Sequence, residues 1–232
     1  MPERCAPVQL FGVVRAELAG RRFIVEGRAA ATIAYGNLAL VVRDLDRSDW
    51  SDAVIAEKLN DPEWATRQAA MQQRVLERAM SAGPVVPARP LTILRREELE
   101  TFVRDNGDRL RRTLARIAGK QEWCLHVYLG PHVTSHEEPY VMRVAPAVLP
   151  APIEGPFSDH VTALWKRCSA VSFGARRIEP AQNPRYLFGA TFLLARNHLR
   201  EFRAALLDLA SEAREMGLTY YLDGPHPPFT FT

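Results

Sequence analysis

The residues of this chain best suited to chemistry gather near its midpoint. Cys124 and His126 alternate onto one face of a predicted strand. Four more residues of metal-ligand type follow in a predicted loop: His132, His136, Glu137 and Glu138. The set lacks the short Cys-x2-Cys or His-x3-His spacing that zinc sites use. We therefore predict no metal site, with Cys124 in the core and the loop histidines exposed to solvent.

No catalytic residue is predicted elsewhere in the sequence. His160 and His198 lie near the starts of two predicted helices without a serine or cysteine partner at a recognisable spacing, so we expect both at the surface. Cys5, Cys124 and Cys168 are odd in number and widely spaced, which is typical of buried thiols in a reducing compartment. The sequence therefore predicts neither a catalytic centre nor a cofactor.

The charge pattern argues against nucleic acid as a partner. Thirty basic and 27 acidic residues are interspersed, with a net charge of +3 and no block of one sign, whereas nucleic-acid binding needs clustered cations. Arg176 and Arg177 fit solvated edge charges better than a phosphate contact. No apolar run approaches the ~20 residues of a membrane span, and no signal peptide is recognised. We expect no membrane partner and a cytoplasmic location.

The second half of the chain predicts a ferredoxin-like domain over residues 121–232. Hydrophobic periodicity gives the order strand, helix, strand, strand, helix, strand. The predicted segments are 123–129, 158–169, 171–178, 186–195, 198–216 and 218–222. A proline-rich insertion at 130–157 joins the first strand to the first helix, and residues 140–144 could add a small strand there. The predicted sheet is four-stranded and antiparallel, with both helices on one face.

The first half predicts a separate, mixed α+β domain over residues 1–120. Its predicted strands cover 8–14, 22–26, 30–35 and 38–42, and its predicted helices cover 51–59, 62–82 and 96–117. Asp61-Pro62 is a helix start, with proline at the first helical position. Residues 84–94 hold three prolines, so they should lie at a sheet edge or run irregularly. Together the two halves predict a two-domain protein of the α+β class.

An aromatic and proline-rich tail ends the chain. Pro225, Pro227 and Pro228 fix the backbone, and Phe229 and Phe231 are two residues apart, so both rings can face one side. The rings could pack onto the chain's own sheet or into a groove between the domains. They could instead form a docking tail for a partner, since exposed terminal aromatics favour association. Both interpretations remain open from the sequence.

Five segments, in a matching order and spacing, resemble the gas vesicle protein family GvpF/GvpL. They are Leu10-Phe-Gly-Val-Val14, the run Tyr35–Asp44, the helix residues Arg74-Val-Leu-Glu77 with Gly83-Pro-Val-Val-Pro-Ala-Arg89, the strand Glu122–Tyr128, and Gly224-Pro-His-Pro-Pro-Phe-Thr-Phe231. The last resembles the family's Gly-Pro-Trp-Pro-Pro-Tyr-Ser/Asn-Phe and is the most specific. The resemblance is to a divergent member, because the family's His-Glu pair falls on Gln72-Gln73 and its Arg-Phe-Gly-Thr reads Arg89-Pro-Leu-Thr92.

The resemblance implies an accessory role in building the protein shell of gas vesicles. Family members are thought to bind the small hydrophobic shell subunit GvpA, and other accessory proteins are further expected partners; no enzymatic activity is implied. The partner-binding candidates are Phe229, Phe231, Pro227, Pro228 and Arg89. The alternative is a small metal-binding protein or enzyme built on the ferredoxin-like half, which zinc or iron content would reveal.

Overall fold

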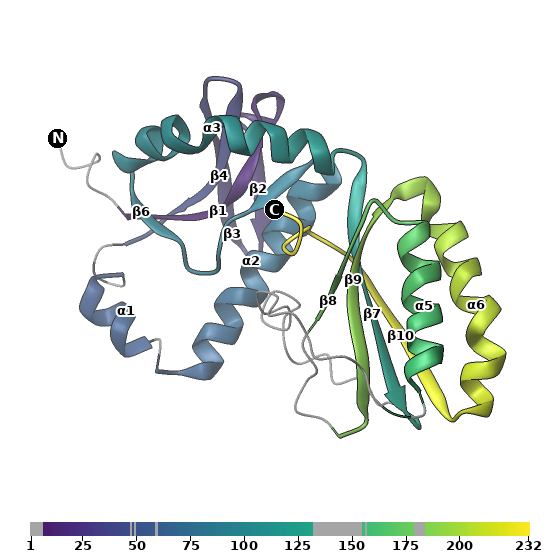
Figure 1. Ribbon diagram of the computed structural model, residues 1–232. Coiled ribbons are helices and arrows are strands. Elements are labelled where there is room, and N and C mark those ends of the chain that lie inside the picture. The colour runs from purple at the N-terminus through teal and green to yellow at the C-terminus, as the bar shows by residue number, and fades with distance from the viewer. Residues whose placement is uncertain are drawn as a thin grey trace. The chain divides into compact units, whose positions relative to one another are not determined.

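The chain folds as two compact units, each with its own sheet. The computed structural model describes residues 7–46, 48, 50–58, 60–131, 155, 157–178 and 184–232. The first unit comprises the described residues up to Ala118, and the second comprises those from Gly119 to Phe231. Both units combine helices with a β-sheet, so the protein is of mixed α+β type (Figure 1).

The first unit holds a six-stranded sheet with two long helices. Its order is β2-β3-β4-β1-β5, and β6 also pairs with β1. The elements are β1 (Pro7–Arg15), η2 (Ala16–Leu18), β2 (Arg22–Val25), β3 (Arg28–Tyr35), β4 (Leu38–Asp44), α1 (Asp52–Lys58), α2 (Pro62–Ala82), β5 (Val85–Pro87), β6 (Ile93–Arg95) and α3 (Glu98–Ile117). All pairs in this sheet are antiparallel.

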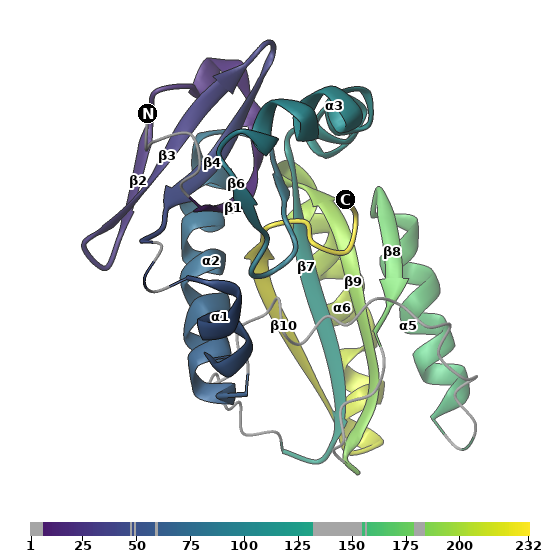
Figure 2. The same cartoon turned by 90° about the vertical axis from the view of Figure 1, so that its left-hand side faces the viewer.

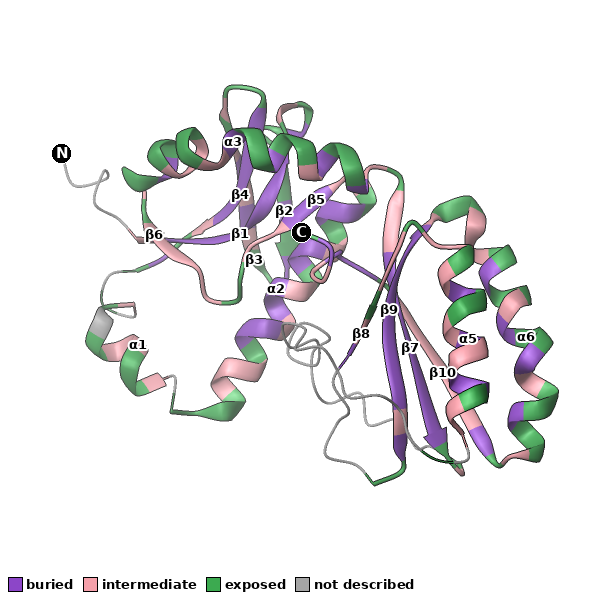
Figure 3. Ribbon diagram, viewed as in Figure 1, coloured by how far each residue is buried: buried purple, intermediate pink, exposed green. Residues whose placement is uncertain are grey.

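The central strand β1 is buried on both faces. Every residue from Val8 to Val14 is buried, although side chains alternate between the faces of a strand (Figure 3). Gly12 lets β5 and α2 lie close to β1, because a Cβ added at this position would be 2.7 Å from the Val86 carbonyl oxygen and 2.9 Å from Leu76 Cδ2. Apolar residues in β1 do not alternate with polar ones, and this pattern is typical of strands that are covered on both faces.

The outer neighbour of β1 is split in two by prolines. Residues 12–14 pair with β5 and residues 7–9 pair with β6, whereas β4 pairs along almost the whole strand. Between the two short strands, Leu91 adopts φ 58° in a turn closed by Thr92 N–H donating to the Arg89 carbonyl at 3.2 Å. The predicted edge position of the proline-rich segment is confirmed for β5.

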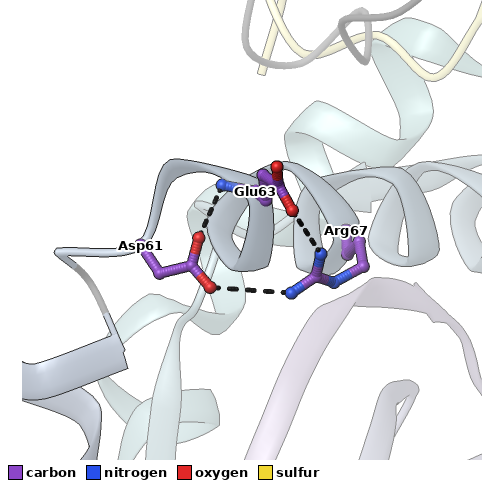
Figure 4. A network of polar contacts seen from close by, with 3 residues as sticks. All are labelled: Asp61, Glu63 and Arg67. Carbon is purple, nitrogen blue, oxygen red and sulfur yellow. Dashed lines mark hydrogen bonds and ion pairs between the residues drawn. The ribbon is translucent and has the colours of Figure 1, made fainter.

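Helix α2 begins where Asp61-Pro62 predicts. Asp61 Oδ1 accepts a hydrogen bond from Glu63 N–H at 2.9 Å, and Pro62 occupies the first helical position. Arg67, one turn later, forms ion pairs with Asp61 at 3.6 Å and with Glu63 at 3.3 Å (Figure 4). The first turn is therefore held by a cap and by a cation shared between its two carboxylates.

The second unit is a four-stranded antiparallel sheet in the order β10-β7-β9-β8, which Figure 2 shows from one edge to the other. Helices α5 and α6 lie side by side on one face (Figure 1). The elements are β7 (Lys120–Leu129), α5 (Ser158–Ala170), β8 (Gly174–Arg177), β9 (Tyr186–Ala195), η3 (Arg196–His198), α6 (Leu199–Glu215) and β10 (Leu218–His226). The sheet and the one-sided placement of its helices agree with the prediction.

The core of this unit lies between the sheet and the two helices. Its buried members from the strands include Trp123, Leu125, Val127, Phe188, Ala190, Phe192 and Leu194. Phe202 of α6 meets Phe192 with ring centroids 5.0 Å apart. Because these strand residues alternate with their neighbours, Glu122, Cys124 and His126 of β7 belong to the opposite, helix-free face.

Three predicted strands differ from those observed, and the first of them, β7, begins at Lys120, three residues before its predicted start. β8 is shorter than predicted, because Ser172 N–H donates to the Ser169 carbonyl and closes the end of α5 before the strand begins. β10 is longer than predicted: after a bulge at Gly224-Pro225 its pairing with β7 resumes at His226. A terminal strand tolerates this proline, which has no N–H to donate. Most of the insertion at 130–157, including the strand proposed at 140–144, lies outside the described residues.

Candidate functional site

The tail after β10 is fastened to the sheet by a buried carboxylate. Glu122 on β7 is fully buried and accepts two hydrogen bonds from Thr230, from its N–H at 3.0 Å and from its hydroxyl at 2.5 Å. Hydrogen bonds to a carboxylate are stronger than those between neutral groups. This role of Glu122 was not predicted from the sequence, although an acidic residue beside the apolar run Trp123–Leu125 is the signal that could have indicated it.

Phe231 anchors the tail further across the same sheet, on β8, which is separated from β7 by β9. Its ring covers Gly174 of β8, where an added Cβ would lie 2.9 Å from the ring. The Arg176 guanidinium lies 5.9 Å from the ring centroid, and only 6% of Phe231 is exposed. At the other end, Gly224 packs against Trp123, leaving no room for a side chain there. The tail is therefore a strap that runs from β10 past β7 to β8.

The five partner-binding candidates occupy different environments. Pro227, Pro228 and Phe231 are buried, Phe229 is half-buried, and Arg89 is exposed in the turn between β5 and β6. The four tail residues lie together in the second unit, whereas Arg89 belongs to the first. The packing of Phe231 onto the chain's own sheet matches the first of the two interpretations of the tail. Phe229 is the ring with more surface open to a partner.

Cys124 and His126 meet on the helix-free face of the sheet. Cys124 Sγ lies 3.0 Å from His126 Nε2, and His126 Nδ1 lies 3.1 Å from the Tyr186 hydroxyl. Tyr186 reaches this position because residue 189 is glycine: a Cβ there would come within 1.7 Å of the hydroxyl. Cys124 is fully buried, as predicted. Cys124, His126 and Tyr186 thus form a buried row of polar side chains. Reactive thiols are usually partly open to solvent, unlike that of Cys124.

No metal site is found in the part of the chain that the structure describes. No group of three His, Cys, Asp or Glu side chains is close enough there to hold an ion. His132, His136, Glu137, Glu138 and Cys5 lie outside the described residues. None of the described helices is long and apolar enough to cross a membrane.

The expected surface position of His160 is wrong. His160 is buried. Its ring shares a hydrogen bond with the Tyr220 hydroxyl and lies 3.4 Å from the Glu212 carboxylate of α6. Desolvation raises the pKa of Tyr220, and the nearby Cys168 thiol and Glu212 carboxylate raise it further. Burial also raises the pKa of Cys168 to about 12, so this thiol stays protonated and is a poor nucleophile.

Comparison with known proteins connects this architecture to one family. The model of the family "Gas vesicle synthesis protein GvpL/GvpF" matches residues 8–153. Gas vesicle protein L of Streptomyces sp. (strain CB03234) is 24% identical over 115 residues, which are 49% of this chain and 43% of that relative. The match thus spans less than half the length of this curated relative.

Two solved structures share the fold. The crystal structures of GvpF from Anabaena sp. PCC7120 and from Microcystis aeruginosa have TM-scores of 0.68 and 0.66 with this chain. Each comparison covers 97% of this chain and 98% of the other, at 11% sequence identity. Similarity at this identity concerns the fold, including the combination of two sheets with helices.

Proposed function

We propose, from the premise that this chain belongs to the GvpL/GvpF family of gas vesicle synthesis proteins, that it is a non-catalytic accessory protein in gas vesicle assembly. The observation that carries the proposal is the family match over residues 8–153. The buried Cys124–His126 pair and the protonated Cys168 thiol fit this role better than a hydrolytic one. Gas vesicles are accordingly the proposed place of action.

The proposed partners are the hydrophobic shell subunit GvpA and other gas vesicle accessory proteins. A subunit that polymerises is prone to aggregate before incorporation, and a carrier could cover its strand edge or apolar face. Each sheet of this chain ends in a strand that could pair with another chain. Ile24 on the terminal strand β2 is 57% exposed, and Phe173 beside the terminal strand β8 is 58% exposed. Pairing at such an edge is a common mode of recognition.

The tail has two proposed roles within this interaction. Phe229 supplies direct apolar contact with the partner, together with Pro227 and Pro228 once they are uncovered. Phe231 supplies the anchor that holds Phe229 in place. Arg89 supplies an exposed cation on the first unit. Because the contact is mainly apolar, binding should depend little on salt.

We also infer that residues 121–232 form a ferredoxin-like domain and residues 1–120 a separate domain. The strand order β10-β7-β9-β8, in which the fourth strand borders the first and the third lies between the first and second, supports the ferredoxin-like topology. Such a domain carries no chemistry by itself, so its surfaces decide its function.

Co-purification of the full chain with GvpA, with and without the other accessory proteins, tests the proposal. We expect binding to persist from low salt to about 0.5 M, where the Debye length is only a few ångströms. Phe229→Ala should weaken binding without changing the melting temperature, whereas Leu207→Ala, at a position 72% exposed on α6, should change neither.

Two results would count against this role. GvpA that never co-purifies, even when all accessory proteins are present, would remove the main support for an assembly function. Stoichiometric zinc or iron in a tag-free preparation would favour the alternative of a metal-binding protein or enzyme.

A further inference from the structure

A cluster of aromatic and cationic side chains lies on the first unit, where the strand β4 leads into α1 and α2. The Arg43 guanidinium lies 5.8 Å from the Phe11 ring centroid and 5.7 Å from that of Trp50. The ring centroids of Trp50 and Trp64 of α2 are 5.6 Å apart, and the Lys58 ammonium lies 6.0 Å from the Trp50 ring centroid. We call Arg43, Trp50, Lys58 and Trp64, all half-buried, the Arg43 patch.

Neutral groups hold the Arg43 side chain in one position. Its Nη2 donates to Gln9 Oε1 at 2.7 Å and weakly to Gln68 Oε1 at 3.5 Å, and its Nη1 contacts Met71 Sδ at 2.9 Å. These partners come from β1 and α2, and all three are buried. The cation is therefore fixed in advance, so a binding partner would not have to order it.

The charge of Arg43 has no carboxylate partner among the described residues. Three acids near the patch in the sequence have partners of their own: Asp46 accepts hydrogen bonds from Ser48, and Asp61 and Glu63 both pair with Arg67 (Figure 4). Asp44, which follows Arg43, pairs with Arg96. Burial, and to a lesser extent the charge of Arg28, lower the pKa of Arg43 to about 10. A half-buried charge normally has an ion-pair partner, since leaving water is costly.

Two hydrogen-bond donors beside this charge also lack an acceptor. Arg43 Nε and Gln9 Nε2 are both buried and have no hydrogen-bond partner. Gln9 itself is fully buried, and its oxygen is already bonded to Arg43. A buried donor without an acceptor is rare and calls for an explanation, such as a group that binds there. Of these two residues only Arg43 has surface open to a partner, and a negatively charged group placed on that surface would match its unpaired charge.

We propose that the Arg43 patch docks an acidic segment of a protein partner, placing an aspartate or glutamate carboxylate on the Arg43 guanidinium and an apolar side chain on Trp50 and Trp64. This inference deepens the proposed function, because it assigns a second contact, charged where the first is apolar, to the same assembly role. Tryptophan and arginine are the residues that most often dominate protein interfaces. Nucleic acids and membranes fit less well, since they need rows of cations, and the cations recorded at this place in the described part of the chain are Arg28, Arg43 and Lys58.

The test uses the full chain and a fluorescein-labelled hexapeptide of alternating glutamate and leucine. We expect saturable binding that changes tryptophan fluorescence and weakens as salt is raised. The matched lysine–leucine peptide should not bind. Arg43→Gln should weaken binding roughly tenfold to a hundredfold, the range for hydrogen bonds between charged groups. Arg78→Gln, the same change at an exposed position of α2, should have no effect.

Arg28→Gln separates a binding role from a structural role of Arg43. Arg28 is exposed and its charge opposes that of Arg43. Removing it should raise the melting temperature slightly, because the repulsion falls, and should weaken peptide binding, because the patch becomes less positive. If Arg43 had only a structural role, Arg28→Gln would raise the melting temperature without weakening peptide binding.

The peptide experiment uses no gas vesicle protein, so its result does not depend on the proposed assembly role. Absence of saturable binding, equal binding of the lysine–leucine peptide, or equal loss in Arg43→Gln and Arg78→Gln would each overturn the proposal. Peptide binding that is weakened by Arg43→Gln, together with no co-purification of GvpA or accessory proteins, would support docking at the Arg43 patch and contradict the assembly role.

Discussion

Replacing Phe231 by alanine should release the tail strap while leaving the rest of the second unit folded. Burying a phenylalanine side chain is worth about 1.5–3 kcal/mol, and an exposed arginine over the ring adds about 0.5–1 kcal/mol. Phe231 is 6% exposed and Arg176 lies 5.9 Å from its centroid, so both contributions apply. No cavity should remain, because the tail can move away. We expect the strap to lose about 2–4 kcal/mol of docking free energy.

Hydrogen–deuterium exchange measures this loss where it occurs. A change of about 2–4 kcal/mol corresponds to roughly 30- to 900-fold faster exchange through local opening. The reporting amide is that of Thr230, which donates to the buried Glu122 carboxylate. Amides in the centre of β7 and β9 should keep their protection, because the core between the sheet and its helices is untouched. Leu207→Ala provides the control, since that side chain is 72% exposed.

Two results would contradict this reasoning. Unchanged exchange at Thr230 in Phe231→Ala would mean that the ring does not anchor the strap. Accelerated exchange throughout β7 and β9 would mean that the strap belongs to the cooperative core of the unit.

Three further predictions follow from single buried positions. Gly12→Ala should lower stability by about 2 kcal/mol or more in a denaturant titration, because the new Cβ would meet the Val86 carbonyl at 2.7 Å; an unchanged midpoint would show that the strand can shift. Thr32→Val should cost about 1–2 kcal/mol, since the hydroxyl donates to two backbone carbonyls at 2.5 and 3.0 Å, and a neutral effect would refute their importance. Cys168 has a raised folded-state pKa of about 12 against an ordinary value of 9.0, so its contribution to stability should be complete below pH 9 and be lost as the pH rises from 9 towards 12. The same thiol should resist iodoacetamide at pH 8 until guanidinium unfolds the chain, and labelling of the folded protein, read by mass spectrometry, would argue otherwise.

The elements that the sequence predicts best are those with a strong local pattern. The strand over Tyr186–Ala195 and the helix over Pro62–Ala82 have the predicted bounds, because a continuous apolar run and a capped amphipathic run are both signals within one segment. The coarse α+β class follows from the same patterns. Strand β8 shows the limit: its first three predicted residues finish the turn after α5, which depends on a backbone hydrogen bond rather than on hydrophobicity.

The features that the sequence could not predict depend on residues far apart in the chain. Glu122 and Thr230 are 108 positions apart, and nothing local marks either as a partner of the other. The burial of His160 likewise depends on Tyr220, 60 positions away. The Arg43 patch joins residues of β4, of the segment before α1, of α1 and of α2, and arginine in a strand predicts an exposed side chain when the sequence is read alone. Contacts of this kind are fixed by topology, which periodicity does not encode.

The split neighbour of β1 has a consequence for synthesis of the chain. β1 is synthesised before the strands that flank it and can pair with β4 once Asp44 is made, but its other edge is completed only by β5 and β6, which end at Arg95. Roughly fifty residues separate those points, and at 5–20 residues per second they take about 3–10 s to translate. During that interval the most buried strand of the first unit has one open edge. Substitutions that slow or weaken the pairing of residues 85–95 should therefore reduce the yield of folded protein during synthesis more than they reduce the stability of the finished molecule.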